Sequence, residues 1–284
     1  MANVGIVGYG FVGKATDYSL REYHNIIFYD KFKEEDTVKG VTRRRHSLEE
    51  VVDHSEFIFV CLPTPFSQSR EEIDLSIVDE NAGKIAKLSN STDKIIVVKS
   101  TVIPGTTERY ANNYNNCNFC FNPEFLREAT YLEDAVNPDR IIIGVNNHKV
   151  YSRVRALFAE GFPDARMFKT DFTTAETVKY MNNAFLAMKV IFANEIHDLC
   201  NRLGISYEEV KNMVVADRRI HDSHLDITSE RGFGGKCFPK DMVALIGLCK
   251  KLGVDASLLE TAWHKNLKIR RHRDWEDIPF AVSD

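Results

Sequence analysis

The chain has 284 residues, a length that suits two domains or one large domain. Hydrophobic residues make up 44% of it and charged residues 27%, which excludes a wholly disordered protein. Its 37 basic and 41 acidic side chains give a net charge of −4, which argues against general nucleic-acid binding. The sequence has no apolar run of about 18 residues, so we expect no membrane span. The N-terminal segment does not resemble a signal peptide and the six cysteines are scattered, which together favour a cytoplasmic protein.

The first 170 residues alternate short apolar runs with segments of helical character. The expected strands are 3–7, 25–30, 57–62, 94–99, 118–121 and 140–145. The expected helices are 11–22, 75–88, 106–114, 125–135 and 148–159. Several strands are unbroken hydrophobic runs, which is typical of a mostly parallel sheet covered by helices on both faces. Residues 1–170 are therefore predicted to form a doubly wound α/β domain.

A long helix over 171–203 dominates the rest of the sequence. Apolar residues recur along it at spacings of three and four: Val178, Met181, Phe185, Met188, Phe192, Ile196, Leu199 and Leu203. Further apolar residues lie on its other faces, more than one neighbouring domain would cover, so we expect a homodimer built on this helix. Helices at 206–215, 239–252 and 255–272, with an irregular stretch at 217–238, complete a helical domain over 171–284.

A glycine motif follows the first strand and opens the first helix: Gly8-Tyr9-Gly10-Phe11-Val12-Gly13. In this context the three glycines allow a tight turn, close approach of a pyrophosphate and close helix–strand packing. Asp30 lies at the end of the second strand, where a carboxylate binds a ribose diol and repels a 2′-phosphate. The pattern predicts a Rossmann-like domain that binds NAD rather than NADP, a preference that the neighbouring Lys31 and Lys33 soften slightly.

A second glycine-rich segment, residues 232–241 (GFGGKCFPKD), places Cys237 between a flexible loop and a Lys-Asp pair. Such a cysteine is a candidate nucleophile, although the segment alone fits a packing cysteine equally well. Cys117 and Cys120 form a lone CxxC without the second pair that a zinc site needs. His221 and His224, with nearby aspartates, are interpreted as solvated loop residues, and we expect no metal site.

Five other segments add to this pattern. They are residues 61–65 (CLPTP), 100–102 (STV) and 122–128 (NPEFLRE) after successive strands, Lys179 with Asn183 one turn apart on the long helix, and residues 217–220 (DRRI) before the glycine loop. In this order and spacing the chain resembles the UDP-glucose/GDP-mannose dehydrogenase family over about residues 3–270. It is most similar to the members that oxidise UDP-glucose.

The resemblance implies a four-electron oxidation of a primary alcohol on a sugar nucleotide, UDP-glucose to UDP-glucuronate, with two NAD reduced. It makes Cys237 the nucleophile that captures the aldehyde and then carries a thioester. It assigns proton and oxyanion chemistry to Lys179 and Asp241, with Asn183 helping to hold the oxyanion. Glu124 is then the base for thioester hydrolysis.

The resemblance also assigns binding roles. Thr101 and Glu128 are expected to order water and the nicotinamide end, and Pro63 and Thr64 to lie along the cofactor. Lys33 and Lys240 complete the expected cofactor-binding set. The expected substrate-binding residues are Glu124, Phe125, Leu126, Arg127, Lys179, Asn183, Arg219, Phe233 and Gly234. Arg219 is expected to reach substrate, including across a dimer interface.

The chain departs from the family pattern in three places. Ser229-Glu230 stands where Pro-Gly is usual, and Ala129 replaces a glycine. The family usually continues into a third domain that closes over the nucleotide, whereas this sequence ends at Asp284 after the expected connecting helix. The segment beyond residue 270 carries two apolar anchors, Trp275 and Phe280.

Two alternative functions remain open on the sequence. A two-electron β-hydroxyacid dehydrogenase also places a Lys and an Asn one turn apart on a long helix. Cys237 and Glu124 argue against it, because a single hydride transfer needs neither a thiol nor a hydrolytic base. A truncated, non-catalytic NAD-binding protein is the other alternative, although the chain retains every expected catalytic residue.

Overall fold

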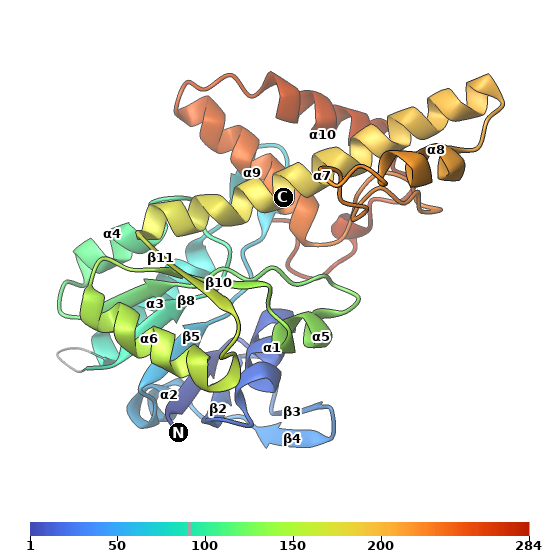
Figure 1. Cartoon of the computed structure of the whole chain (residues 1–284). Helices are drawn as coiled ribbons and strands as arrows, with labels where there is room; N and C mark the ends of the chain where they lie inside the picture. Colours follow the sequence, from blue (N-terminus) through green and yellow to red (C-terminus); the bar gives the residue numbers. More distant parts are fainter. Residues whose placement is uncertain (90–92, 284) are drawn as a thin grey trace. The chain divides into compact units, whose positions relative to one another are not determined.

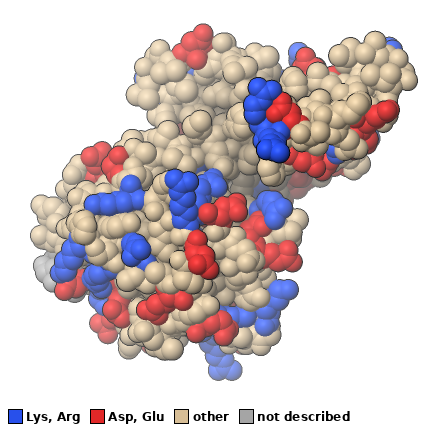
Figure 2. All heavy atoms as spheres, viewed as in Figure 1, with Lys and Arg blue, Asp and Glu red and all other residues tan. Residues whose placement is uncertain are grey.

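The computed structural model describes residues 1–89 and 93–283. By its internal contacts the chain divides into two units, which are described separately (Figure 1). The first unit comprises Met1–Thr64 and Asp74–Lys179, and the second comprises Pro65–Ile73 and Tyr180–Asp284. No helix among the described residues is long and apolar enough to cross a membrane. Acidic and basic side chains are interspersed on the face that Figure 2 shows, in keeping with the small net charge.

The first unit is built on a seven-stranded sheet in the order β11-β10-β9-β8-β5-β1-β2. Its strands are β1 (Asn3–Val7), β2 (Asn25–Tyr29), β5 (Phe57–Val60), β8 (Ile95–Val98), β9 (Asn118–Phe121), β10 (Arg140–Gly144) and β11 (Arg166–Thr170). Every neighbouring pair is parallel except β9 with β10, which meet antiparallel at Phe121 and Gly144. The predicted α/β class with a mostly parallel sheet is therefore confirmed.

Helices cover both faces of this sheet (Figure 1). They are α1 (Phe11–Leu20), α2 (Leu48–His54), α3 (Ser76–Leu88), α4 (Thr106–Asn113), α5 (Tyr131–Val136) and α6 (His148–Gly161). Alternate strand residues supply two separate cores: Phe59 and Val97 pack on the face that holds α1 and α6, whereas Val60 and Val98 pack on the face that holds α2 and α3. Burial on both faces explains why these strands are continuous apolar runs in the sequence.

Some elements of the first unit were not predicted. The edge strand β11 is largely exposed and lacks a hydrophobic run, so its sequence carries no strand pattern. A hairpin of β3 (Glu35–Val38) and β4 (Val41–Arg44) follows β2. The helix expected at 125–135 was wrong in extent, since α5 begins only at Tyr131. The residues before it form a loop in which the Glu124 carboxylate accepts the Leu126 amide hydrogen at 2.8 Å.

The second unit is helical, with a small hairpin. The long predicted helix is confirmed as α7 (Phe172–Leu203), which begins in the first unit and continues into the second. The other elements are β6 (Phe66–Ser67), β7 (Glu72–Ile73), α8 (Tyr207–Val214), α9 (Cys237–Lys251), α10 (Ser257–Ile269) and the 3-10 turn η1 (Asp274–Glu276). Helix α9 begins at Cys237, two residues earlier than expected, so the cysteine occupies the first helical position.

The residues after α10, 270–283, are here called the C-terminal tail. Of its two expected anchors, Trp275 is fully buried, with its ring centroid 5.7 Å from that of Trp263, whereas Phe280 is 51% exposed. The end of the tail pairs with β6, where the Phe66 amide donates to the Ala281 carbonyl at 2.9 Å. The tail is thus an ordered part of the second unit.

Candidate active site

The β1–α1 loop of the first unit has the form of a dinucleotide cradle. A Cβ placed on Gly13 would lie 2.1 Å from the Gly8 carbonyl oxygen, so only glycine permits this approach of helix to strand. A Cβ placed on Gly10 would have no heavy atom within 4 Å, and Gly10 caps the N-terminus of α1. Open space against a helix N-terminus suits a pyrophosphate. The residues present therefore fit the cofactor that the sequence implied.

Asp30 is held against this loop at the end of β2. One carboxylate oxygen accepts the Tyr9 amide hydrogen at 2.7 Å, and the other accepts the Phe32 amide hydrogen at 2.9 Å. The Tyr9 ring stacks on Phe28 at 4.0 Å and lies in the core, so Tyr9 serves the loop through its backbone. Lys33 donates to the Tyr9 carbonyl at 2.9 Å, which places its ammonium group beside the same loop.

The segment after β5 contains other expected cofactor residues. The Ser100 hydroxyl accepts the Leu62 amide hydrogen at 2.8 Å, so the start of the loop after β8 holds the end of β5. Thr64 is buried and Pro63 exposed. Burial raises the pKa of the Cys61 thiol to about 12, which makes this cysteine a packing residue rather than a nucleophile.

Glu124 and Lys179 form a buried ion pair in the first unit. The Lys179 ammonium donates to a Glu124 carboxylate oxygen and to the Glu124 backbone carbonyl, both at 2.7 Å. Burial opposes ionisation of Glu124, but the Lys179 charge and hydrogen bond hold the pKa of Glu124 below its ordinary value. Glu124 is therefore a carboxylate with a fixed orientation, and Lys179 is its counter-ion.

A second lysine of this unit, Lys99 at the end of β8, was not among the expected site residues. Its ammonium donates to the Asn122 side-chain oxygen at 2.7 Å, and Asn122 in turn donates to the Ile142 carbonyl at 2.8 Å. Burial lowers the pKa of Lys99, which also interacts electrostatically with Glu124. Its position directly before Ser100 at a strand end was the signal available in the sequence.

The expected residues on the loop between β9 and α5 differ in exposure. The Phe125 ring lies 5.8 Å from the Lys179 ammonium and 4.1 Å from the Arg140 guanidinium. Arg127 pairs with Asp134 at 2.6 Å. Leu126 is partly buried, Glu128 is exposed, and Thr101, after β8, is partly buried.

In the second unit, a buried polar network lies at the start of α9. The Asn183 amide donates to the Asp241 carboxylate at 2.6 Å, and the Lys240 ammonium pairs with the other Asp241 oxygen. Asp241 is fully buried and Asn183 is 5% exposed. Cys237 is partly exposed and lies four residues before Asp241, so the two side chains share one face of the helix.

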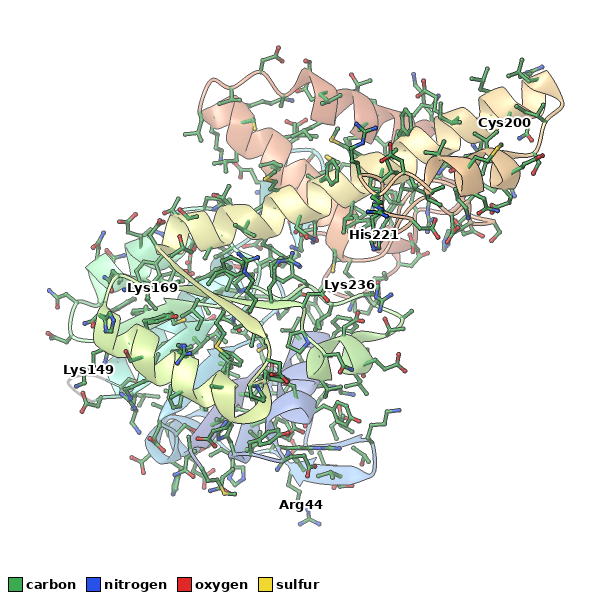
Figure 3. The ribbon with its side chains drawn as sticks, viewed as in Figure 1. Arg44, Lys149, Lys169, Cys200, His221 and Lys236 are labelled. Atoms are coloured by element: carbon green, nitrogen blue, oxygen red, sulfur yellow. The ribbon has the colours of Figure 1, made fainter. Side chains whose placement is uncertain are left out.

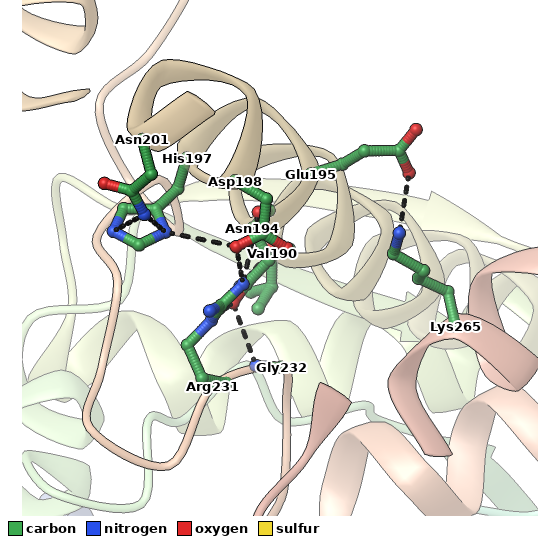
Figure 4. Close-up of polar contacts among 9 residues, drawn as sticks. All are labelled: Val190, Asn194, Glu195, His197, Asp198, Asn201, Arg231, Gly232 and Lys265. Carbon is green, nitrogen blue, oxygen red and sulfur yellow. Dashed lines mark hydrogen bonds and ion pairs between the residues drawn. The ribbon is translucent and has the colours of Figure 1, made fainter. Parts of the chain in front are cut away.

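Residues 230–236, here called the cysteine loop, precede α9 and are fixed from α7 (Figure 4). The Asn194 side-chain oxygen accepts two hydrogen bonds, one from the Arg231 guanidinium at 2.6 Å and one from the Gly232 amide at 3.3 Å. Arg231 also binds Asp198 at 2.7 Å. Lys236, labelled in Figure 3, ends the loop as the N-cap of α9. The loop is thus tied to the long helix one residue before Phe233.

Helix α10 also holds the cysteine loop, through contacts with Phe233. Asn266 is fully buried, and its side chain accepts the Phe233 amide hydrogen at 2.7 Å and donates to the Phe233 carbonyl at 3.0 Å. Phe233 is itself 3% exposed and stacks on Trp263 at 6.0 Å. Arg231 and Asn266 were not predicted, because a single Arg or Asn at a loop or on a helix gives no local signal.

Arg219 lies elsewhere in the second unit, on the loop after α8. Its guanidinium pairs with Asp217 at 2.6 Å, and the side chain is 87% exposed. Arg219 and the neighbouring His221 (Figure 3) help to line a groove of about 370 Å³ between α7 and α8, whose apolar walls include Phe185 and Phe192.

Comparison with known proteins assigns both parts of the chain to one family. Residues 33–161 match the NAD binding domain of the UDP-glucose/GDP-mannose dehydrogenase family, and residues 173–268 match its central domain. A UDP-glucose 6-dehydrogenase from Rickettsia bellii is 38% identical over 222 residues, which cover 76% of this chain and 50% of that protein. The UDP-glucose 6-dehydrogenase TuaD of Bacillus subtilis is 30% identical, covering 96% of this chain and 64% of the relative.

Solved structures agree. A UDP-glucose dehydrogenase from Pyrobaculum islandicum superposes with a TM-score of 0.83 at 29% identity, over 94% of this chain and 68% of that one. A 3-hydroxyisobutyrate dehydrogenase from Mycobacterium tuberculosis, with a TM-score of 0.73 at 15% identity, shares the fold. The chain spans about half the length of the Rickettsia relatives. Two adjacent domain matches, in the expected order, show that the chain belongs to the UDP-glucose/GDP-mannose dehydrogenase family.

Proposed function

We propose that the chain oxidises a sugar nucleotide with NAD, from primary alcohol to carboxylate, and that UDP-glucose is the substrate and UDP-glucuronate the product. The observation that carries this proposal is Cys237 at the first position of α9, with the Asp241–Asn183 hydrogen bond one turn further on. A thiol beside a buried carboxylate and amide suits covalent capture of an aldehyde. Relatives named UDP-glucose 6-dehydrogenase support the choice of sugar nucleotide.

The first unit supplies the cofactor site in this proposal. Gly10 and the N-terminus of α1 bind the pyrophosphate, and Asp30 binds the ribose diol. NAD, when bound, accepts the hydride in each of the two oxidations. The backbone hydrogen bonds to Asp30 fix its carboxylate before the cofactor arrives, so NAD binding needs little rearrangement of this loop.

Cys237 carries the substrate between the two oxidations. Its sulfur adds to the aldehyde carbon and the thiol proton goes to the aldehyde oxygen, which gives a thiohemiacetal. That carbon then gives up a hydride and its hydroxyl group gives up a proton, which leaves a thioester. Water attacks the thioester carbon and the C–S bond breaks; one water proton goes to the sulfur and the other is released, so carboxylate and free thiol result. Two electron pairs leave the substrate, so each carboxylate formed accompanies two NADH.

Proton and oxyanion chemistry falls to the buried polar groups. Asn183 and Lys179 are the donors proposed for the developing oxyanion, and Asp241 orients Asn183 through their hydrogen bond. Glu124 is the base proposed for water attack on the thioester. Its lowered pKa keeps it ionised at neutral pH, at the cost of basicity, so its role depends more on orientation than on proton affinity.

A two-electron β-hydroxyacid dehydrogenase is the second candidate function. The 3-hydroxyisobutyrate dehydrogenase from Mycobacterium tuberculosis shares the fold at 15% identity. That chemistry uses one hydride transfer and gives neither Cys237 nor Glu124 a task. We therefore favour the four-electron reaction, and the number of NADH molecules formed per substrate distinguishes the two.

A panel of sugar nucleotides tests the proposal. The purified chain is incubated with NAD and each compound, and NADH absorbance is followed together with acid formation by mass spectrometry. Two NADH per UDP-glucuronate support the proposal, whereas one NADH per product favours the β-hydroxyacid class. NAD binding without turnover of any compound favours a non-catalytic role.

We also propose a homodimer built on α7. Five large apolar side chains along this helix are at least half exposed in the isolated chain: Met181, Phe185, Phe192, Leu199 and Leu203. Two of them, Phe185 and Phe192, also line the groove between α7 and α8, together with Val214 and Ile220. A second copy is the occupant proposed here, because these exposed apolar side chains recur along α7 from Met181 to Leu203. Arg219 on the rim of the groove is then placed to reach the partner's substrate.

Sedimentation at micromolar concentration tests this dimer. We expect about twice the monomer mass of 32.5 kDa for the parent chain. Phe192→Glu is expected to give a monomer, because it buries a charge in the interface. Leu258→Glu, which changes a 66% exposed apolar residue on α10, serves as the matched control and is expected to stay dimeric. A monomeric parent refutes the proposal.

We further propose a cytoplasmic location. The six cysteines, all within the described residues, form no disulfide with one another, and three of them, Cys61, Cys120 and Cys200, are buried. A reducing compartment preserves such thiols. The proposed reaction requires it as well, because oxidised Cys237 cannot add to an aldehyde.

A further inference from the structure

The C-terminal tail folds back onto the cysteine loop. The Arg270 guanidinium donates to the Arg231 carbonyl at 3.0 Å, and the Gly235 amide donates to the Asp274 carboxylate at 3.0 Å. Arg270 and Asp274 also pair with each other at 3.0 Å, and the Arg270 side chain is only 9% exposed. Two tail residues that fix one another therefore each hold a different part of the loop.

The fit between tail and loop is close at Gly234. A Cβ placed on Gly234 would lie 2.2 Å from an Asp274 carboxylate oxygen and 2.3 Å from an Arg270 guanidinium nitrogen. The loop thus passes directly under the ion pair, with no room for a side chain. Glycine loops have many accessible backbone conformations, so an external contact is needed to select one.

A row of aromatic rings extends this contact to the cysteine. Trp275 of the tail lies 5.7 Å from Trp263, and Trp263 lies 6.0 Å from Phe233 of the loop. Phe233 meets Phe238 edge-on at 6.2 Å, and Phe238 directly follows Cys237. Burial of the tail tryptophan is therefore coupled by packing to the first turn of α9.

The far end of the tail is fixed as well. The Phe66 amide donates to the Ala281 carbonyl, and the Ser283 amide donates to the Phe66 carbonyl, both at 2.9 Å. Because α10 holds one end and β6 the other, Asp274 and Trp275 lie in a segment anchored on both sides. The tail is therefore fixed at both ends.

We infer that the C-terminal tail positions Cys237 for reaction, and that Asp274 is the residue through which it acts. Asp274 does not touch the thiol; it is a positioning residue that fixes the backbone immediately before α9. Misplacement of a reacting atom by about 1 Å costs on the order of a hundredfold in rate. The effect on turnover rests on the proposed function, whereas the effect on the loop does not.

The test compares the full-length Asp274→Ala variant with the parent chain. Alkylation by iodoacetamide is measured for each cysteine by peptide mass spectrometry, and kcat and KM are measured with UDP-glucose and NAD. We expect Cys237 to be alkylated about three- to tenfold faster, because the loop opens more often. We expect kcat to fall about ten- to a hundredfold and the KM for NAD to stay the same. Asp274→Asn keeps an oxygen for the Gly235 amide and is expected to restore most of kcat.

Two references separate positioning from general loss of structure. Cys249, near the other end of α9, is also partly exposed and should keep its alkylation rate in Asp274→Ala. Asp277→Asn removes a tail carboxylate that pairs with the exposed His272 at 2.8 Å, and should behave as the parent. The inference is overturned if Asp274→Ala leaves both the alkylation rate of Cys237 and kcat unchanged. It is also overturned if the alkylation rates of Cys237 and Cys249 rise together, because that indicates a general loss of structure. If the parent turns over no sugar nucleotide, the proposed function fails while the alkylation contrast still decides the role of the tail.

Discussion

Two glycine-rich loops precede helix N-termini in this chain, and they are held in different ways. In the β1–α1 loop, a Cβ on Gly13 would meet the backbone oxygen of Gly8. In the cysteine loop, a Cβ on Gly234 would meet the ends of two side chains, Asp274 and Arg270. At these two glycines, the first loop packs against its own main chain, and the second packs against side chains distant in the sequence.

The difference suits what each loop is proposed to bind. A dinucleotide pyrophosphate is the same in every turnover, and a main-chain cradle provides a fixed shape for it. The cysteine loop precedes the proposed nucleophile, which in that proposal meets substrate, aldehyde and thioester in succession. Side-chain contacts from α7, α10 and the tail can yield slightly at each stage, and in the same proposal they make Cys237 sensitive to substitutions far from it.

The largest effect is expected at the proposed nucleophile, Cys237. Cys237→Ser should lower kcat more than about a thousandfold, because a serine hydroxyl is un-ionised at neutral pH and its ester leaves poorly. NAD binding should be unchanged, since the glycine motif lies in the first unit. NADH formation and calorimetric NAD titration measure the two properties. Acid production at the parental rate by the serine variant contradicts the thioester mechanism.

Alanine at one glycine of each loop tests the comparison directly. Gly13→Ala must displace backbone, so we expect a loss of about 3 kcal/mol or more in the free energy of unfolding, with NAD binding abolished. Gly234→Ala must displace only side-chain ends, so we expect a loss of about 1 kcal/mol. Urea unfolding measures both, and equal losses contradict the contrast drawn between the loops.

The sequence predicted the elements on either side of the β1–α1 loop, but the contacts of the cysteine loop only in part. The strand before Gly8, the helix after it and the position of Asp30 follow from local periodicity and spacing, and all were confirmed. The same holds for α7, whose apolar spacing runs without interruption by Gly or Pro. Local patterns suffice where an element is shaped by its own residues.

The contacts that hold the cysteine loop could not be predicted in this way. Asn266 and Asp274 bind residues 33 and 39 positions earlier in the chain, and no local pattern reports such pairs. The short α5 has the same cause, because the Glu124 carboxylate and its ion pair with Lys179 organise the loop before it. In the residues before α5, long-range polar contacts outweigh the local preference for a helix.

The buried carboxylate Glu124 provides the next largest effect. Glu124→Gln leaves the Lys179 ammonium buried without a counter-ion, at a cost of about 3 kcal/mol in the free energy of unfolding. It should also slow thioester hydrolysis about a hundredfold. The trapped thioester is then visible as an adduct by intact-protein mass spectrometry. A variant that folds, turns over normally and shows no adduct contradicts the assigned role.

The pH dependence of stability separates Glu124 from a second buried carboxylate, Glu176. The folded-state pKa of Glu124 is lowered, so its contribution is present above the unfolded pKa of about 4.3 and is lost as pH falls through the folded value. Burial raises the pKa of Glu176, whose carboxylate accepts the Gly105 and Thr107 amide hydrogens at 2.6 and 2.8 Å. Its contribution has the opposite sign and is lost as pH rises. Glu124→Gln should flatten the acid limb of the stability profile, and Glu176→Gln should not.

The smallest effect is expected at Asp30, beside the β1–α1 loop. Asp30→Asn keeps an oxygen for the Tyr9 amide, loses the acceptor for the Phe32 amide and removes the charge that repels a 2′-phosphate, so the contact with the glycine motif should hold while selectivity falls. We expect the ratio of NAD to NADP affinity to drop about tenfold, which is within the range of one charge-assisted hydrogen bond. The control is Glu34→Gln, which alters an 80% exposed carboxylate four residues later that pairs with Arg45 at 2.6 Å. Titration of both cofactors into each variant measures the ratio. An unchanged ratio in Asp30→Asn means that the discrimination lies elsewhere in the loop, and a parent that prefers NADP removes the assignment of Asp30 altogether.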